Sequence, residues 1–263
     1  MIAEQAQQND PVPAVHLTFA EPDVAANIQR QAHSALQWLA RLSNSYVEAK
    51  PDASHLLLRW NEEREAIASP EIASDTTVEL QPNKFYLQFC ENGQPTRHAI
   101  TLDDISPARV EAWCLIELLH RNLDRDRFSK DLPYDVDGLM KGDAEEFETY
   151  GREEIFERLG SLLSDAAALL KSVQPADEGI GIDPQDFTLF RRVGQDREIG
   201  LCLADREVGQ PFYYRSSAAT SHWHRPRSRS TGIEILTAKA IVSDGKTLDD
   251  ILAFLAGNGS REG

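Results

Sequence analysis

The sequence predicts an α+β fold made of two similar halves, each with a helix, about four mainly antiparallel strands and a second helix. Two long segments, 21–44 and 151–173, carry apolar residues at helical spacing. Short segments with the apolar alternation or density typical of strands follow each of them. A segment rich in Asp, Gly and Pro, 124–150, separates the two series. This repeated order suggests an internal duplication, although no residue-level repeat accompanies it.

The first half is expected over residues 21–123, after a polar N-terminal extension at 1–20. Its strands are predicted at 54–60, 76–80, 84–90 and 97–102. Asn92-Gly93 predicts a tight hairpin turn, because these residues accept positive φ values. Ser106-Pro107 predicts the start of a helix that runs to about Arg121, since a serine hydroxyl caps free N–H groups and proline lacks an N–H that the first turn does not need.

The second half is expected over residues 151–257, after the acidic connector at 124–150 and before a flexible C-terminus at 258–263. Beyond its first helix, strands are predicted at 187–193, 198–204, 212–215 and 232–242, and a last helix at 248–255. Thr247 and Asp250 have the spacing of a capping box at the start of that helix. The two small sheets could fuse into one or pack back to back, and both arrangements are α+β.

Composition limits the classes of partner and the compartment. The 43 acidic and 27 basic residues give a net charge of −16, which repels nucleic-acid phosphates and anionic lipids, so no nucleic-acid or membrane partner is expected. There is no long apolar segment or signal peptide. Cys90, Cys114 and Cys202 lie in apolar runs whose spacing fits neither disulfides nor a metal knuckle. The sequence thus predicts a soluble cytoplasmic protein with buried thiols, and leaves its oligomeric state open.

Common catalytic and cofactor motifs are absent from the sequence. Gly179-Ile-Gly181 precedes a predicted strand and is followed by Pro184, so it is no dinucleotide fingerprint. Nucleophile elbows, Walker loops and zinc-protease signatures are also missing. The carboxylate pairs mostly lie at predicted helix starts, where anions are stabilised by free N–H groups. No cofactor is therefore expected.

The least usual segment is 212–230, FYYRSSAATSHWHRPRSRS, which gathers basic and aromatic residues in an acidic chain. We interpret it as a binding site for a small anionic ligand or a partner segment, because guanidinium groups bind carboxylates and phosphates beside an apolar wall. The candidate ligand-binding residues are Tyr214, Arg215, His222, Trp223, His224, Arg225 and Arg227.

Other interpretations of that segment stay open. His222 and His224 could act as a general base or as metal ligands in a hydrolase or transferase. The glycine and glutamate spacings of a cupin are missing, however, and no ligand pattern surrounds the remaining histidines (His16, His33, His55, His98 and His120), so no metal site is assigned. The segment could also be a solvated Arg/Ser loop, or the chain a structural partner protein with an apolar docking patch. His55, beside apolar neighbours, is expected to be structural.

The order of segments resembles that of an uncharacterised bacterial domain family, a domain of unknown function. The segments that carry the resemblance are ALQWLARL in the first helix, Ser54-His55-Leu56-Leu57, the hairpin 76–102, DLPYD in the connector, the helix around Phe156, Pro211–Tyr214, and the terminal GIEILTAKAIV and DDILAFLAG. They span most of the chain from about Leu36. The chain departs from the family at Leu56-Leu57, where members have tryptophans, and at Arg215-Ser216-Ser217, where they have a proline-rich aromatic stretch. The resemblance implies a bacterial source and this order of elements, but no reaction.

Overall fold

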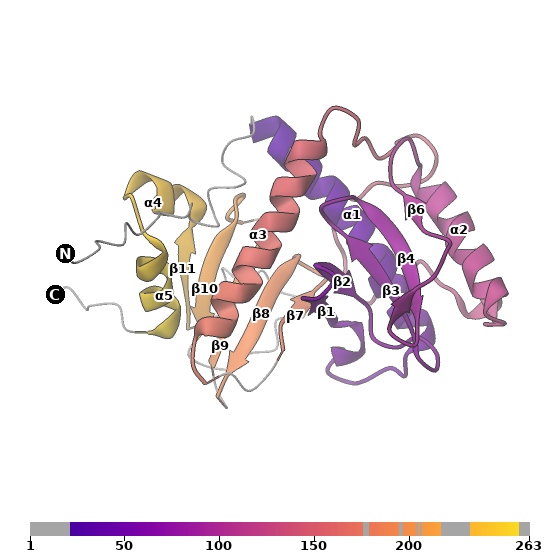
Figure 1. Ribbon diagram of the computed structural model, residues 1–263, viewed down its shortest axis with the longest axis horizontal. Helices are drawn as coiled ribbons and strands as arrows, with labels where there is room; N and C mark the ends of the chain where they lie inside the picture. Colours follow the sequence, from indigo (N-terminus) through magenta and orange to yellow (C-terminus); the bar gives the residue numbers. More distant parts are fainter. Residues whose placement is uncertain are drawn as a thin grey trace, which may run out of the picture.

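The computed structural model describes residues 22–175, 179–194, 197–203, 205, 207–216 and 232–257. Within them, one 11-stranded antiparallel sheet runs through the middle of the molecule and helices flank it (Figure 1). The strands are β1 (Leu58–Asn61), β2 (Ala66–Ala68), β3 (Thr76–Gln81), β4 (Tyr86–Glu91), β5 (Gln94–Pro95), β6 (Ile100–Thr101), β7 (Gly181–Asp183), β8 (Thr188–Val193), β9 (Arg197–Cys202), β10 (Phe212–Ser216) and β11 (Ile233–Thr237). The α-helices are α1 (Pro22–Tyr46), α2 (Pro107–His120), α3 (Glu153–Ser172), α4 (Ala238–Ser243) and α5 (Leu248–Ala256), with short 3₁₀ turns η2 (Ser54–Leu56) and η3 (Arg125–Arg127).

The two halves share this sheet. Its strand order is β11-β10-β9-β8-β7-β1-β2-β3-β4-β5, and β6 also pairs with β4. β1 and β7, the first strands of the two halves, pair antiparallel with Leu58 opposite Ile182. Of the two arrangements that the sequence allows, the fused sheet is therefore the observed one, and the α+β class is confirmed. The suggested duplication is not confirmed by this arrangement and stays a hypothesis.

One face of the sheet carries buried apolar side chains in both halves. In the first half, Trp60 lies opposite Ile67, and Ile67 lies opposite Leu80. In the second half, Ile182 pairs with Leu189 across β7 and β8. Residues opposite one another in antiparallel strands share a face, so these side chains meet the buried stripes of α1 and α3 in a single core. Figure 1 shows α3 lying across β8, with α2 at one end of the molecule and α4 and α5 at the other.

Several predicted elements are confirmed by the structure. Asn92 and Gly93, with φ values of 51° and 70°, form the two-residue turn between β4 and β5. The Ser106 side chain accepts the Arg109 N–H at the start of α2. Thr247 and Asp250 form the capping box of α5.

Other predictions were wrong in detail. The predicted strand 54–60 begins as the 3₁₀ turn η2, so His55 is not in a strand; it is buried and its Nδ1 accepts the Lys50 N–H at 3.2 Å. The predicted strand 232–242 ends at Thr237, whose side chain accepts the Ala240 N–H and so starts α4. The predicted strand 97–102 contains only β6, since the chain leaves the sheet between Pro95 and Ile100. β2 and β7, three residues each, were not predicted.

No helix in the described ranges is both long enough and apolar enough to cross a membrane.

Candidate metal centre

Tyr214 and Arg215, the described members of the predicted anion site, take part in internal contacts of the fold. The buried Tyr214 hydroxyl donates to Glu198 Oε1 at 2.7 Å. Arg215 Nη2 lies 2.7 Å from Glu234 Oε2, and its Nη1 donates at 2.8 Å to the carbonyl of Phe254 in the last turn of α5. The other predicted members, His222, Trp223, His224, Arg225 and Arg227, lie outside the described residues.

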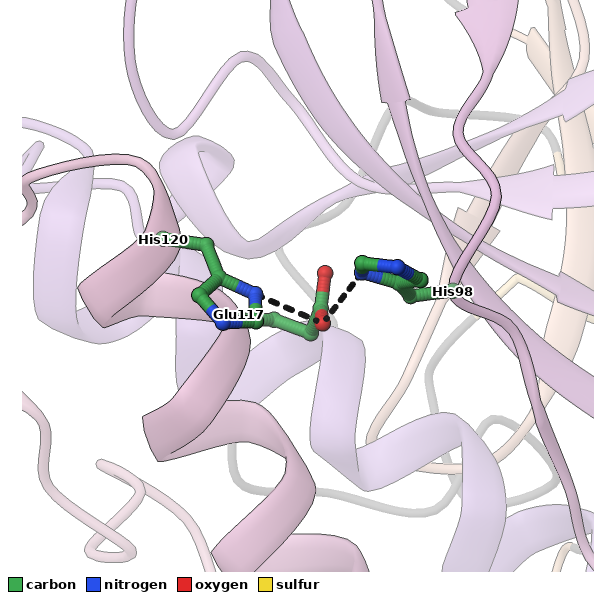
Figure 2. Close-up of side chains that lie close together, drawn as sticks. All are labelled: His98, Glu117 and His120. Carbon is green, nitrogen blue, oxygen red and sulfur yellow. Dashed lines mark ion pairs between the residues drawn. The ribbon is translucent and has the colours of Figure 1, made fainter.

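A different group of titratable side chains converges at the outer end of the first half. His98, Glu117 and His120 each offer one ligand atom, and these atoms all lie within 4.8 Å of one another. His98 Nδ1 is 3.4 Å and His120 Nδ1 is 3.3 Å from the same oxygen, Glu117 Oε1. Figure 2 shows both imidazole rings directed at this carboxylate from opposite sides. The arrangement is a candidate metal centre.

Local structure explains why these side chains meet. Glu117 and His120 are three residues apart on α2, a spacing that places two side chains on the same helix face. His98 lies in the break between β5 and β6, where the chain bulges away from β4. Pro95, at the start of the break, has no N–H to continue a ladder. The interrupted strand therefore presents His98 to the last turn of α2.

The distances can be compared with those of metal coordination and of hydrogen bonding. A charge-assisted N–H···O bond has a nitrogen-to-oxygen distance of about 2.7–2.9 Å. In a tetrahedral zinc site, bonds of about 2.0–2.1 Å separate neighbouring ligand atoms by about 3.4 Å. The two nitrogen-to-oxygen distances of 3.4 and 3.3 Å match the edge of that tetrahedron and exceed the length of a good hydrogen bond.

Arg121 fixes the orientation of the Glu117 carboxylate. Its Nη1 donates to Glu117 Oε2 at 2.7 Å and to the Glu117 carbonyl at 2.8 Å, which leaves Oε1 directed at the histidines. Two further contacts hold the Arg121 guanidinium. Its central carbon, Cζ, lies 4.3 Å from the centroid of the Phe89 ring, and its Nε lies 2.9 Å from Glu91 Oε1. The Glu117 and Glu91 carboxylates and the Arg121 guanidinium together carry a net charge of −1 when both histidines are neutral. This negative charge favours the binding of a cation. Outer-shell contacts of this kind orient metal ligands in proteins.

Exposure differs sharply among the three ligands. The Glu117 side chain is 2% exposed, whereas those of His98 and His120 are 64% and 51% exposed. A buried anion therefore lies beneath two solvent-facing imidazoles. An ion held by these three side chains would be open to solvent on the side of His98 and His120.

Sequence reasoning missed this centre, having found no ligand pattern around His98 or His120. The Glu-x-x-His spacing of Glu117 and His120 is the one local signal, and it is common on helices without any metal. His98 precedes Glu117 by 19 residues, and only the break in the strand brings it close.

Comparison of the chain with protein-family models, with curated proteins and with solved structures finds no match. The resemblance to a bacterial domain of unknown function consequently stays an expectation.

Proposed function

We propose that the protein binds a divalent transition-metal ion, Zn²⁺ in the first place, through His98, Glu117 and His120, and that the bound ion takes a small anionic ligand. The observation that carries the proposal is the pair of 3.3–3.4 Å distances from the two Nδ1 atoms to one Glu117 oxygen. The proposed ligand is a small anion, as the sequence suggests, but the proposed site is at α2 and not in the segment 212–230.

The donor set selects the class of metal. Imidazole nitrogen suits zinc, copper, nickel and iron, whereas calcium and magnesium prefer oxygen ligands. Zinc has no geometric preference of its own and accepts two histidines and a carboxylate in a tetrahedron. Three protein ligands leave a fourth position for water or an anion, and that position lies on the exposed side of His98 and His120.

The alternative of a metal-dependent hydrolase uses the same residues. Two histidines and a glutamate also hold zinc in catalytic sites, where the metal activates a water molecule. Catalytic sites are dry, shaped cavities, however, and His98 and His120 are more than half exposed. Binding is therefore the favoured function, and hydrolysis of p-nitrophenyl acetate by the zinc-loaded protein would favour the alternative.

Calorimetric titration of the metal-free chain with Zn²⁺ tests the proposal. We expect one ion per chain, and a loss of affinity on His98→Ala, Glu117→Gln or His120→Ala that exceeds the 10- to 100-fold typical of outer-shell partners. Glu111→Gln, on the same helix but outside the cluster, is the matched control and should bind normally. His222→Ala/His224→Ala tests the competing histidine pair and should also leave the affinity unchanged.

Cobalt substitution tests the geometry and the open position. The Co²⁺ protein should show the intense visible absorption of a tetrahedral site, and titration with azide should change that spectrum. Zinc binding that survives all three ligand substitutions would refute the metal site. A cobalt spectrum indifferent to azide would refute the anionic ligand but leave the metal site standing.

A further inference from the structure

The outward face of α2, at one end of the molecule (Figure 1), is apolar. Apart from one residue near its start and one at its end, the exposed residues of α2 are Ala112, Ile116 and Leu119. Ile116 and Leu119 are 51% and 52% exposed. A surface helix normally presents polar residues to solvent, as α3 does with Glu154 and Glu157. Exposed apolar side chains grouped beside a polar centre are typical of a ligand-binding surface.

Two apolar residues lie one helical turn before the metal ligands of α2. Ile116 is four residues before His120, and Trp113 is four residues before Glu117. Side chains four residues apart are neighbours on one face of a helix. Because helical side chains lean toward the N-terminus of their helix, the two ligand side chains lean toward these apolar residues. The surface that adjoins the metal centre along α2 is therefore formed by Trp113 and Ile116, which we call the apolar strip.

Trp113 is held by the same group of side chains that orients Glu117. Its ring is partly exposed, and the ring centroid lies 5.3 Å from that of Phe89. Phe89 also contacts the Arg121 guanidinium, which binds the Glu117 carboxylate. An indole ring held in this way can bind an apolar group with little further loss of conformational entropy.

The charge of the loaded centre favours a ligand with a single negative charge. A Zn²⁺ ion (+2) bound by two neutral histidines and the Glu117 carboxylate (−1) carries a net charge of +1, and the charges of Glu91 and Arg121 cancel each other. One monoanion neutralises this charge. The chain as a whole carries −16, which repels ligands of higher negative charge.

We propose that the anion bound at the metal centre is an aliphatic monocarboxylate whose hydrocarbon chain lies along the apolar strip. This inference rests on the proposed metal site. The carboxylate takes the fourth position of the metal, on the exposed side of His98 and His120. One helical turn is about 5.4 Å long, so a chain of about four to six carbons reaches from the metal to Trp113 and Ile116. Contact with the strip removes apolar surface from water, a contribution that an inorganic anion lacks.

Titration of the full-length Co²⁺ protein with carboxylates of increasing length tests this inference. Acetate, butyrate and hexanoate are added while the visible absorption of the ion is followed, and hexanol, which lacks the carboxylate, is the control ligand. A methylene half removed from water strengthens binding by about twofold, so we expect hexanoate to bind at least about fivefold more tightly than acetate. Hexanol should leave the spectrum unchanged. Equal affinities of hexanoate and acetate, or equal responses to hexanol and hexanoate, would overturn the inference.

Two substitutions locate the hydrocarbon chain on the surface of α2. Ile116→Ser should lower the ratio of the hexanoate and acetate affinities by about threefold or more, because it removes apolar surface from the strip, and should leave acetate binding unchanged. Leu119→Ser is the matched control. Leu119 is equally exposed on the same helix, but it is two residues from Glu117 and so lies on a different face. Equal effects of the two substitutions would refute the assignment of the chain to the apolar strip.

The same titrations separate a failure of this inference from a failure of the metal site. A cobalt spectrum that responds to azide and acetate, but with an affinity independent of chain length, would overturn the apolar strip alone. A protein that binds neither Zn²⁺ nor Co²⁺ would overturn both proposals.

Discussion

Replacing Arg191 by methionine is expected to destabilise the protein by removing the charged cap of α3. Arg191 lies in β8, is 1% exposed and points at the C-terminal end of that helix. Its Nη1 donates to the carbonyls of Leu170 at 2.6 Å, Lys171 at 3.0 Å and Val173 at 2.8 Å. Its Nη2 donates to the carbonyl of Pro175. One side chain thus satisfies the carbonyl groups that the end of a helix leaves without partners.

The magnitude follows from opposing contributions. Hydrogen bonds to a charged group stabilise a protein by about 1.5–3 kcal/mol each, and Nη1 has only two hydrogens for its three acceptors, so about three bonds count. Methionine restores apolar packing and removes the cost of burying a charge, which amounts to several kcal/mol. The expected net loss is about 3 kcal/mol of unfolding free energy, which lowers Tm by roughly 6–12 °C in a chain of this size.

Thermal and urea unfolding followed by circular dichroism measure this loss. Arg192→Met is the matched control, because Arg192 is the next residue of β8, is exposed and should change the stability little. Arg191→Lys should fall between the two, since an ammonium keeps the charge without the planar fork. Hydrogen exchange of the last turn of α3 should quicken in Arg191→Met alone. Equal stabilities of the Arg191→Met and Arg192→Met proteins would refute the capping role.

Three further predictions concern packing and thiol chemistry. Tyr213→Phe should leave Tm unchanged or raise it, because the buried Tyr213 hydroxyl has no hydrogen-bond partner among the described residues; a clear drop in calorimetry would contradict this. Gly160→Ala should destabilise the protein by about 1–3 kcal/mol in urea unfolding, because the new Cβ would lie 2.5 Å from Asn83 Cβ. The helix-propensity gain of about 1 kcal/mol does not offset this clash. Ser161→Ala, the control, should not destabilise the protein. Burial raises the pKa of the Cys90 thiol to about 12, so a thiol-reactive disulfide should label it at pH 8 only after unfolding, and rapid labelling of the native protein would be the contrary result.

The order of elements could be predicted from the sequence because the long amphipathic helices and the caps are local signals. α1 and α3 each carry a continuous apolar stripe, and α2 and α5 start at side-chain caps. β2 and β7 escaped prediction because three residues are too few to show a period. They exist because neighbouring strands supply their hydrogen bonds on both sides.

The metal centre could not be predicted, for a different reason. His98 was read as part of a regular strand, in which its side chain would have no reason to meet α2. The Thr96 N–H still donates to the Phe89 carbonyl of β4 at 2.9 Å, after which the chain leaves β4 until β6, and the residue pattern of 97–102 does not reveal this departure. Only after this break is located do the Glu-x-x-His pair on α2 and His98 become one site.

Arg215, the arginine of the predicted anion site that lies in the described residues, contacts a helix end, and two other arginines of the second half do the same. The last turn of a helix carries partial negative charge and free carbonyls, and it competes with any external anion for a nearby guanidinium. In the second half, three arginines bind helix ends. Arg191 caps α3. Arg197 Nη1 donates to the Ala256 carbonyl at 3.1 Å and Arg215 Nη1 donates to the Phe254 carbonyl, so these two arginines cap α5. A local excess of arginines in an acidic chain therefore indicates helix ends as readily as ligands.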